Sequence, residues 1–164
     1  MTGRATFSDE EWNLLVNLPR WVVRAASASQ RDNARRTFIE VEAGFLSIAE
    51  GRTLGSDLVK EIAQHTMAVF DQPRGRPEDA GMLVTDSDTE AGLAAVIDHA
   101  QAAVAVMAAK APADASAYRR WLLAISDEVV SAAKSHDTFG IGGVYVTESE
   151  ETFDRRLERA IAET

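Results

Sequence analysis

Cysteine is absent from the 164 residues, which excludes disulfides, thiolate metal sites and cysteine nucleophiles. This absence fits a protein of the reducing cytoplasm. The first residues also lack an apolar core of signal-peptide length, because acidic residues arrive as early as Asp9 and Glu10. We therefore expect a cytoplasmic protein without an export signal.

Basic residues are in the minority, with 17 Lys and Arg against 26 Asp and Glu, which gives a net charge of −9 at pH 7. Nucleic acid and anionic membrane surfaces repel such a protein at long range. The most apolar run, residues 91–109, is mostly alanine and contains Asp98, His99 and Gln101, so it falls short of a membrane span. We expect neither nucleic acid nor a membrane as a partner.

Strand-like segments are scarce as well. Val144, Tyr145 and Val146 form the only β-like tripeptide, which is too short to build a sheet. Elsewhere the apolar residues recur at the spacing of amphipathic helices, and a 46% hydrophobic content over this length is enough for one compact core. The sequence therefore predicts an all-α fold, in which residues 1–164 form a single compact bundle of six or seven helices.

Local signals indicate where several helices begin and end. Ser8 and Glu11 form a capping box that starts the first helix, and Pro19, which lacks an amide hydrogen, predicts a kink or break near Leu18. Residues 71–85 are rich in proline and glycine and predict a long connection. The alanine-rich helix after this connection is expected at the centre of the bundle, because alanines let neighbouring helices approach closely.

A glycine-rich loop precedes the last predicted helix. It contains Gly140, Gly142 and Gly143 between two aromatic residues, Phe139 and Tyr145. Glycine amides next to a helix can surround a phosphate, but this loop lacks the lysine, the Ser/Thr and the preceding strand of a P-loop. We expect a structural loop that reverses the chain and seals one end of the bundle, anchored by its aromatic side chains.

Polar residues on apolar helix faces are the candidate functional residues, because burying them costs free energy unless a partner is supplied. At 100° per residue, Glu42 falls between Phe38 and Phe45 on the inner face of its helix, whereas Glu40 points away. On the next predicted helix, Glu61 stands one turn before an inward-facing histidine, His65.

These positions define a candidate carboxylate and histidine metal site, or an acid-base pair, of Glu42, Glu61, His65 and His136, the last of which continues the inner face of the fifth predicted helix. The same residues also fit a structural role. Glu42 would then accept hydrogen bonds from a tryptophan indole or from loop amides, and each histidine would satisfy one carbonyl at a helix end.

Two stretches resemble a known group of proteins. Residues 7–12 read Phe-Ser-Asp-Glu-Glu-Trp with a proline one to two turns later, and residues 139–150 read Phe-Gly-Ile-Gly-Gly-Val-Tyr-Val-Thr-Glu-Ser-Glu. Both are similar to segments of small uncharacterised bacterial all-helical proteins, and more loosely to the TerB-like group of the tellurite-resistance type. That resemblance implies an all-helical fold and, for the TerB-like group, acidic clusters that bind metal ions.

Two functions follow from these patterns. The first is a non-enzymatic helical module that binds a protein partner or itself through an exposed face, which exposure of Trp12, Trp21 or Trp121 would favour. It needs no cofactor. The alternative is a metal-binding or metal-dependent protein of the stress-response type, which requires a divalent metal ion at the four Glu and His positions. A third possibility, a small apolar ligand between the helices, needs only a cavity.

Overall fold

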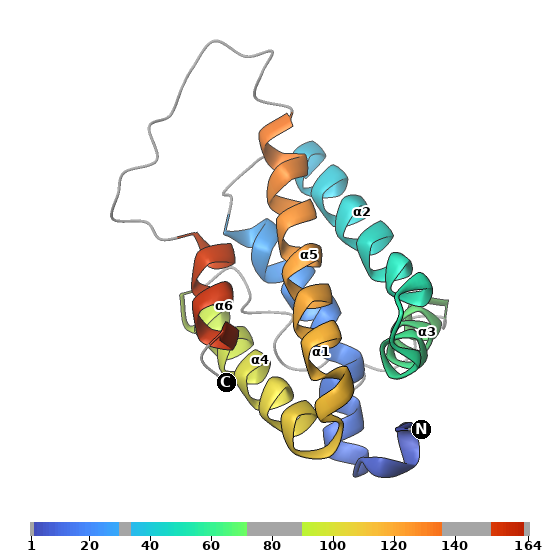
Figure 1. The fold of residues 1–164 in the computed structure, drawn as a ribbon. Coiled ribbons are helices and arrows are strands. Elements are labelled where there is room, and N and C mark those ends of the chain that lie inside the picture. The colour runs from blue at the N-terminus through green and yellow to red at the C-terminus, as the bar shows by residue number, and fades with distance from the viewer. Residues whose placement is uncertain (1, 30–33, 72–89, 136–151, 163–164) are drawn as a thin grey trace.

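A computed structural model describes residues 2–29, 34–71, 90–135 and 152–162, apart from the side chains of 34–37, 69–71 and 133–135. Over these residues the chain forms α-helices and two 3₁₀ turns, with no strand, and the predicted all-α fold is confirmed (Figure 1). The helices are α1 (Asp9–Ala28), α2 (Ala34–Glu50), α3 (Asp57–Asp71), α4 (Glu90–Lys110), α5 (Pro112–Ser135) and α6 (Phe153–Ala162), and the turns are η1 (Arg4–Thr6) and η2 (Gly51–Thr53).

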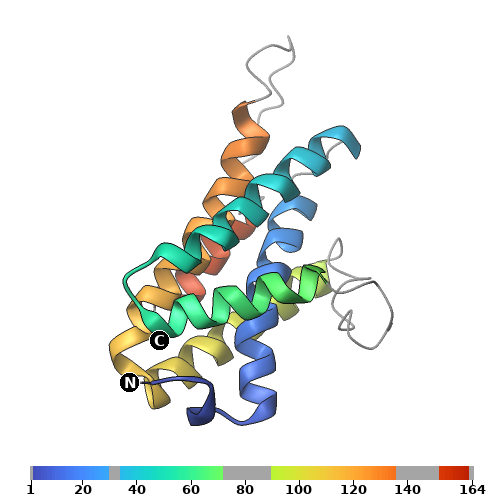
Figure 2. The ribbon, with the colours of Figure 1, turned by 90° about the vertical axis from the view of Figure 1, so that its right-hand side faces the viewer.

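Helices α1 and α5 form the centre of the bundle, since each of them contacts all of the other helices. Helix α5 lies in front of α1, with α2 and α3 on one side and α4 and α6 on the other (Figures 1 and 2). The expectation that the alanine-rich helix is central was wrong. Helix α4 contacts α1, α5 and α6, but Ala102, Ala105 and Ala108 are exposed, because alanine is tolerated on a helix surface as readily as in a core.

Local signals mark the start of three helices, and one of them, the capping box of Ser8 and Glu11, was predicted. The capping box of α1 forms as expected: Glu11 accepts from the amide of Ser8 at 2.7 Å, and Ser8 Oγ accepts from the amide of Glu11 at 3.2 Å. Ser56 caps α3 by accepting from the amide of Val59 at 3.0 Å. Helix α5 begins at Pro112, where a missing amide hydrogen costs nothing.

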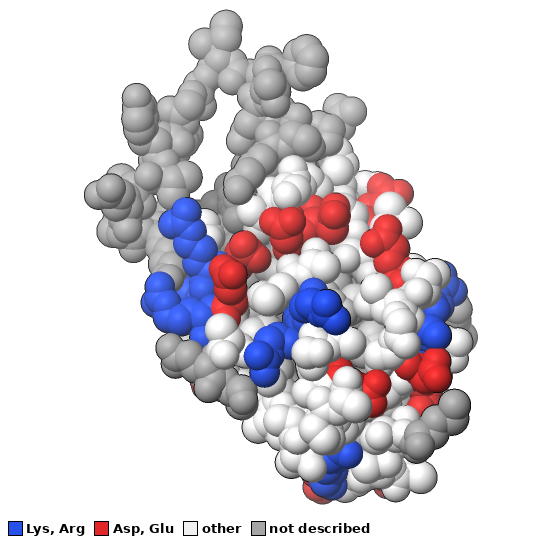
Figure 3. Space-filling model, in the orientation of Figure 1, with Lys and Arg blue, Asp and Glu red and all other residues white. Residues whose placement is uncertain are grey.

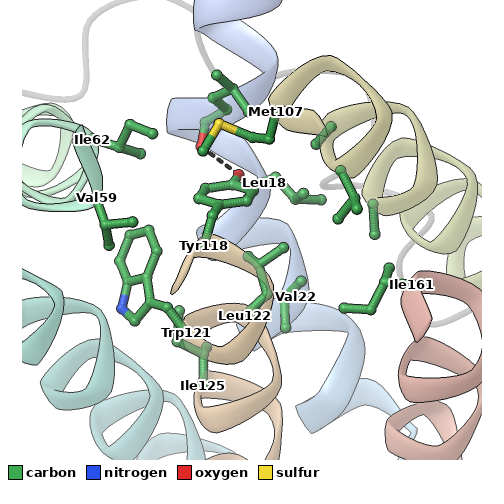
Figure 4. Close-up of a cluster of buried hydrophobic side chains, with 14 of the residues drawn as sticks. Leu18, Val22, Val59, Ile62, Met107, Tyr118, Trp121, Leu122, Ile125 and Ile161 are labelled. Carbon is green, nitrogen blue, oxygen red and sulfur yellow. Dashed lines mark hydrogen bonds between the residues drawn. The ribbon is translucent and has the colours of Figure 1, made fainter. Parts of the chain in front are cut away.

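The break predicted near Leu18 does not occur, since α1 runs through Pro19 without interruption. Proline removes the amide that would bond the carbonyl of Leu15. Tyr118, a fully buried residue of α5, donates its phenol hydrogen to that carbonyl at 2.9 Å (Figure 4). Thr66 of α3 has one hydroxyl hydrogen and two acceptors, the next carbonyl of α1, that of Val16, at 2.8 Å and the Ile62 carbonyl of its own helix at 2.9 Å. Helix α5 therefore satisfies the carbonyl that Pro19 leaves without an amide.

Helix α4 is long and apolar enough to cross a membrane, contrary to the expectation for residues 91–109. This property follows from its length and composition alone, and the core helices of soluble proteins can share it. About a third of this stretch is buried inside the bundle, where Val96, Ala100, Val104 and Met107 join the hydrophobic core.

Candidate interaction surface

Helix α2 is rotated relative to the prediction: Ile48 is buried and Val41 and Phe45 pack against the core as predicted, but Phe38 is exposed. Glu40 is fully buried and accepts a hydrogen bond from Ser27 at 2.7 Å, whereas Glu42 is exposed. The prediction that Glu42 faces inward and Glu40 points away was therefore wrong. The prediction placed Phe38 and Glu42 on the inner face, whereas Glu40, Gly44 and Ser47 share that face with Ile48.

Small residues let α2 approach its neighbours closely. A Cβ atom on Gly44 would lie 2.7 Å from the Val23 side chain and 2.8 Å from that of Val129, and one on Gly51 would lie 2.5 Å from the Trp121 ring. Both glycines are buried and lie on one side of the helix. Only glycine fits these contacts, and this requirement fixes the rotation of α2 about its axis.

Fixing this rotation leaves large apolar side chains in solvent. Phe38 is 69% exposed and Leu46 is 63% exposed, and they stand one turn to either side of the exposed Glu42. They are the only large hydrophobic side chains that are exposed among the described residues. We call Phe38, Glu42 and Leu46 the outer face of α2.

The tryptophans, whose exposure was expected to mark an interaction surface, do not do so. Trp12 is 5% exposed and Trp121 is 2% exposed, and Trp21 is half-buried. The indole of Trp121 donates to the carbonyl of Ser47 at 3.2 Å and so ties α5 to α2. Trp12 and Trp121 are core residues of the bundle, as Figure 4 shows for Trp121, and Trp21 packs against the core.

A groove of about 550 Å³ lies between α2, the turn into α3, and α5. On α5 it is lined by the small residues Ala113, Ser116, Ala117 and Ala124, by Trp121, and by two charged residues, Asp114 and Arg120. Across the groove, Ser56 Oγ donates to Asp114 at 2.8 Å, which ties the start of α3 to the first turn of α5. On α2 it is lined by Ser47, which is buried on the side of the helix opposite Phe38, and by Glu50, so the groove adjoins Leu46 at the C-terminal end of α2 and does not extend to Phe38.

Carboxylates border this region. Glu42 and Glu50 are exposed on α2, and Glu128 is exposed one turn beyond Ala124, on the groove side of α5. Figure 3 shows acidic side chains over the upper part of α5 and along α2. The groove also holds one cation, Arg120, whose Nε donates to the Ser116 carbonyl at 3.3 Å.

The candidate metal ligands are placed as follows. Glu61 and His65 lie one turn apart on α3, as expected, but His65 is exposed, with its ring edge-on to Trp12 at a centroid distance of 5.3 Å. Glu61 accepts from the amide of Arg4 at 3.3 Å. His136 lies outside the described residues. Within the described part of the chain no three His, Asp or Glu side chains could hold a metal ion, so a site of all four residues stays a prediction.

The glycine-rich loop of Phe139, Gly140, Gly142, Gly143 and Tyr145 also lies outside the described residues, and its structural role stays a prediction.

The residues that form the outer face of α2 carried a signal in the sequence. Phe38 and Leu46 are eight residues apart and therefore share one helix face. Two glycines, Gly44 and Gly51, share the other face, and glycine inside a helix indicates close packing. No protein-family model, no curated protein and no solved structure matches the chain, so its resemblance to the TerB-like group stays a prediction.

Proposed function

We propose that this protein is a non-enzymatic helical module that binds another protein through the outer face of α2. One observation carries the proposal: α2 exposes Phe38 and Leu46 while it buries the carboxylate Glu40. A helix that served only its own bundle would be more stable with polar residues in place of this exposed pair. An exposed apolar pair beside a groove is typical of a binding surface.

The two exposed side chains are large enough to matter for binding. Burying a whole Phe or Leu side chain contributes roughly 1.5–3 kcal/mol, so two that are about two-thirds exposed contribute roughly 1–2 kcal/mol each. Aromatic and aliphatic anchors of this kind, seated in a pocket on the partner, dominate the energetics of many interfaces. The proposal can therefore be tested by changing two residues, Phe38 and Leu46.

The test is site-specific photo-crosslinking in the cells that produce the protein. Phe38 is replaced by p-benzoylphenylalanine, and the matched control carries the same group at Ala102, an exposed position on α4. We expect a discrete adduct from position 38 that is absent from position 102 and lost when Leu46→Ser is added. Mass spectrometry of the adduct distinguishes a second copy of this chain from a different protein.

The proposal fails if position 38 gives no discrete adduct, or if position 102 gives the same one. A metal-dependent function stays a prediction beside it. Its test is the retention of a divalent metal ion by the purified full chain in native mass spectrometry, and the loss of that ion in His65→Ala.

A further inference from the structure

The charges beside the outer face of α2 restrict what can bind there. Glu42 sits in the middle of the exposed apolar pair, Glu50 lines the groove, and Glu128 is exposed one turn beyond Ala124, while the cation of the groove, Arg120, donates to the Ser116 carbonyl of its own helix. Each of these carboxylates is exposed and loses part of its hydration when a partner covers it. A partner that offers cations at these positions offsets that cost, and a partner that offers carboxylates increases it.

From this arrangement we infer that the α2–α5 face receives a basic amphipathic helix of a protein partner. This inference rests on the proposed function and specifies the chemistry of the partner. The apolar stripe of the incoming helix packs on Phe38 and Leu46, and its lysine or arginine residues pair with Glu42 and Glu50. Helix-in-groove recognition uses anchors at this i, i+3/i+4, i+7 spacing.

The dimensions of the face fit such a ligand. Phe38 and Leu46 are eight residues apart, which at a rise of 1.5 Å per residue is about 12 Å along α2, or two turns of an incoming helix. The groove of about 550 Å³ adjoins Leu46 at the C-terminal end of α2, where Ala117, Ala124 and Trp121 line it together with Arg120. The incoming helix therefore packs on Phe38 and Leu46, and a side chain near one of its ends reaches the groove.

A second copy of the chain is the less suitable occupant. In an antiparallel pairing of two α2 helices about their centres, Phe38 would meet Leu46 of the other copy. The same pairing would bring Glu42 against Glu42 in the centre of the contact. Two carboxylates without a cation between them repel at that distance, and the net charge of −9 on each copy adds to the repulsion at long range.

The inference is tested with the purified full-length protein and two synthetic helices of about 18 residues, in which a leucine stripe is flanked by lysines in one peptide and by glutamates in the other. Kd is measured by fluorescence anisotropy at about 50 mM and 300 mM salt. We expect the lysine peptide to bind at least about ten-fold more tightly than the glutamate peptide, with binding that weakens at the higher salt.

Variants distinguish binding of the lysine peptide at this face from its general attraction to an acidic protein. Glu42→Lys and Glu158→Lys change the net charge equally, but Glu158 lies on α6, away from the proposed surface. We expect Glu42→Lys to weaken binding of the lysine peptide at least about ten-fold more than Glu158→Lys does. Phe38→Ser with Leu46→Ser should weaken it by a similar factor, and circular dichroism verifies that this variant is folded.

Three results would overturn the inference: equal affinity for both peptides, equal effects of the two charge reversals, or no effect of the serine pair. If these occur while photo-crosslinking at position 38 still gives a discrete adduct, the proposed function stands and only the chemistry of the partner is wrong. A dimer of the free protein that forms already at about 50 mM salt in sedimentation, and that depends on Phe38 and Leu46, would replace the basic helix by a second copy.

Discussion

The phenol of Tyr118 compensates for Pro19 in helix α1. Burial raises the pKa of Tyr118, so its hydroxyl remains a donor at every physiological pH, and its acceptor is the Leu15 carbonyl that Pro19 leaves without an amide. Tyr118→Phe should lower the free energy of unfolding by about 1–3 kcal/mol, because the buried carbonyl then has no partner. Chemical denaturation measures this difference.

A double-mutant cycle with Pro19→Ala assigns that loss to the proline. Alanine at position 19 restores an amide that can reach Leu15, so Tyr118→Phe should cost less in the Pro19→Ala background than in the wild type. Equal costs in the two backgrounds would show that Tyr118 stabilises the bundle by some other contact.

Packing requires glycine at two positions, Gly44 within α2 and Gly51 directly after its end. Gly51→Ala should lower the free energy of unfolding by about 1–3 kcal/mol, because its Cβ would overlap the buried ring of Trp121. Gly44→Ala should act in the same direction through Val23 and Val129. The matched control is Gly55→Ala, which meets no atom within 4 Å and should leave stability unchanged or slightly raised.

At the scale of elements, an ion pair joins the start of α1 to the end of α4. Lys110 Nζ lies 2.6 Å from Glu11 Oε2, and this hydrogen bond, together with the Ser8 amide, lowers the pKa of the Glu11 carboxyl from its ordinary value of 4.5. A lowered pKa in the folded state means that the ionised carboxylate stabilises the fold above pH 4.5. That stabilisation is lost as the pH falls through the lower, folded-state value.

Glu11→Gln should therefore lower the Tm at pH 7 and have a progressively smaller effect below pH 4.5. Glutamine keeps the capping box, so the difference reports the charge. In a Lys110→Met background the dependence of this difference on pH should become weaker. If the Tm difference between wild type and Glu11→Gln is the same at pH 3 and pH 7, the ion pair contributes nothing measurable.

At the scale of the whole molecule, the net charge and the exposed apolar pair have opposite effects on self-association. The charge of −9 repels a second copy, and salt screens that repulsion, with a Debye length of about 10 Å at 0.1 M and about 3 Å at 1 M. Sedimentation velocity should show a monomer at low salt and weak self-association near 1 M salt. Phe38→Ser with Leu46→Ser should stay monomeric throughout, and Glu42→Gln should associate at lower salt than the wild type.

Much of the fold could be predicted because its signals are local. Capping residues such as Ser8 and Ser56 satisfy amides within their own first turn, and apolar periodicity identifies each helix from its own residues. The composition alone excluded thiolate chemistry, because no cysteine is present. Within the described residues, the sequence therefore determined which segments are helices and the class of the fold.

The candidate site depended on contacts between helices, which local patterns do not contain. The sequence does not show that Tyr118 replaces the hydrogen bond lost at Pro19, and so the continuous α1 was missed. Nor does it show that Gly44 and Gly51 must face α1 and α5. The packing of α2 decided its rotation, because a Cβ atom would not fit where Gly44 and Gly51 meet Val23, Val129 and Trp121, and the same rotation leaves Phe38 and Leu46 on the outer face of α2.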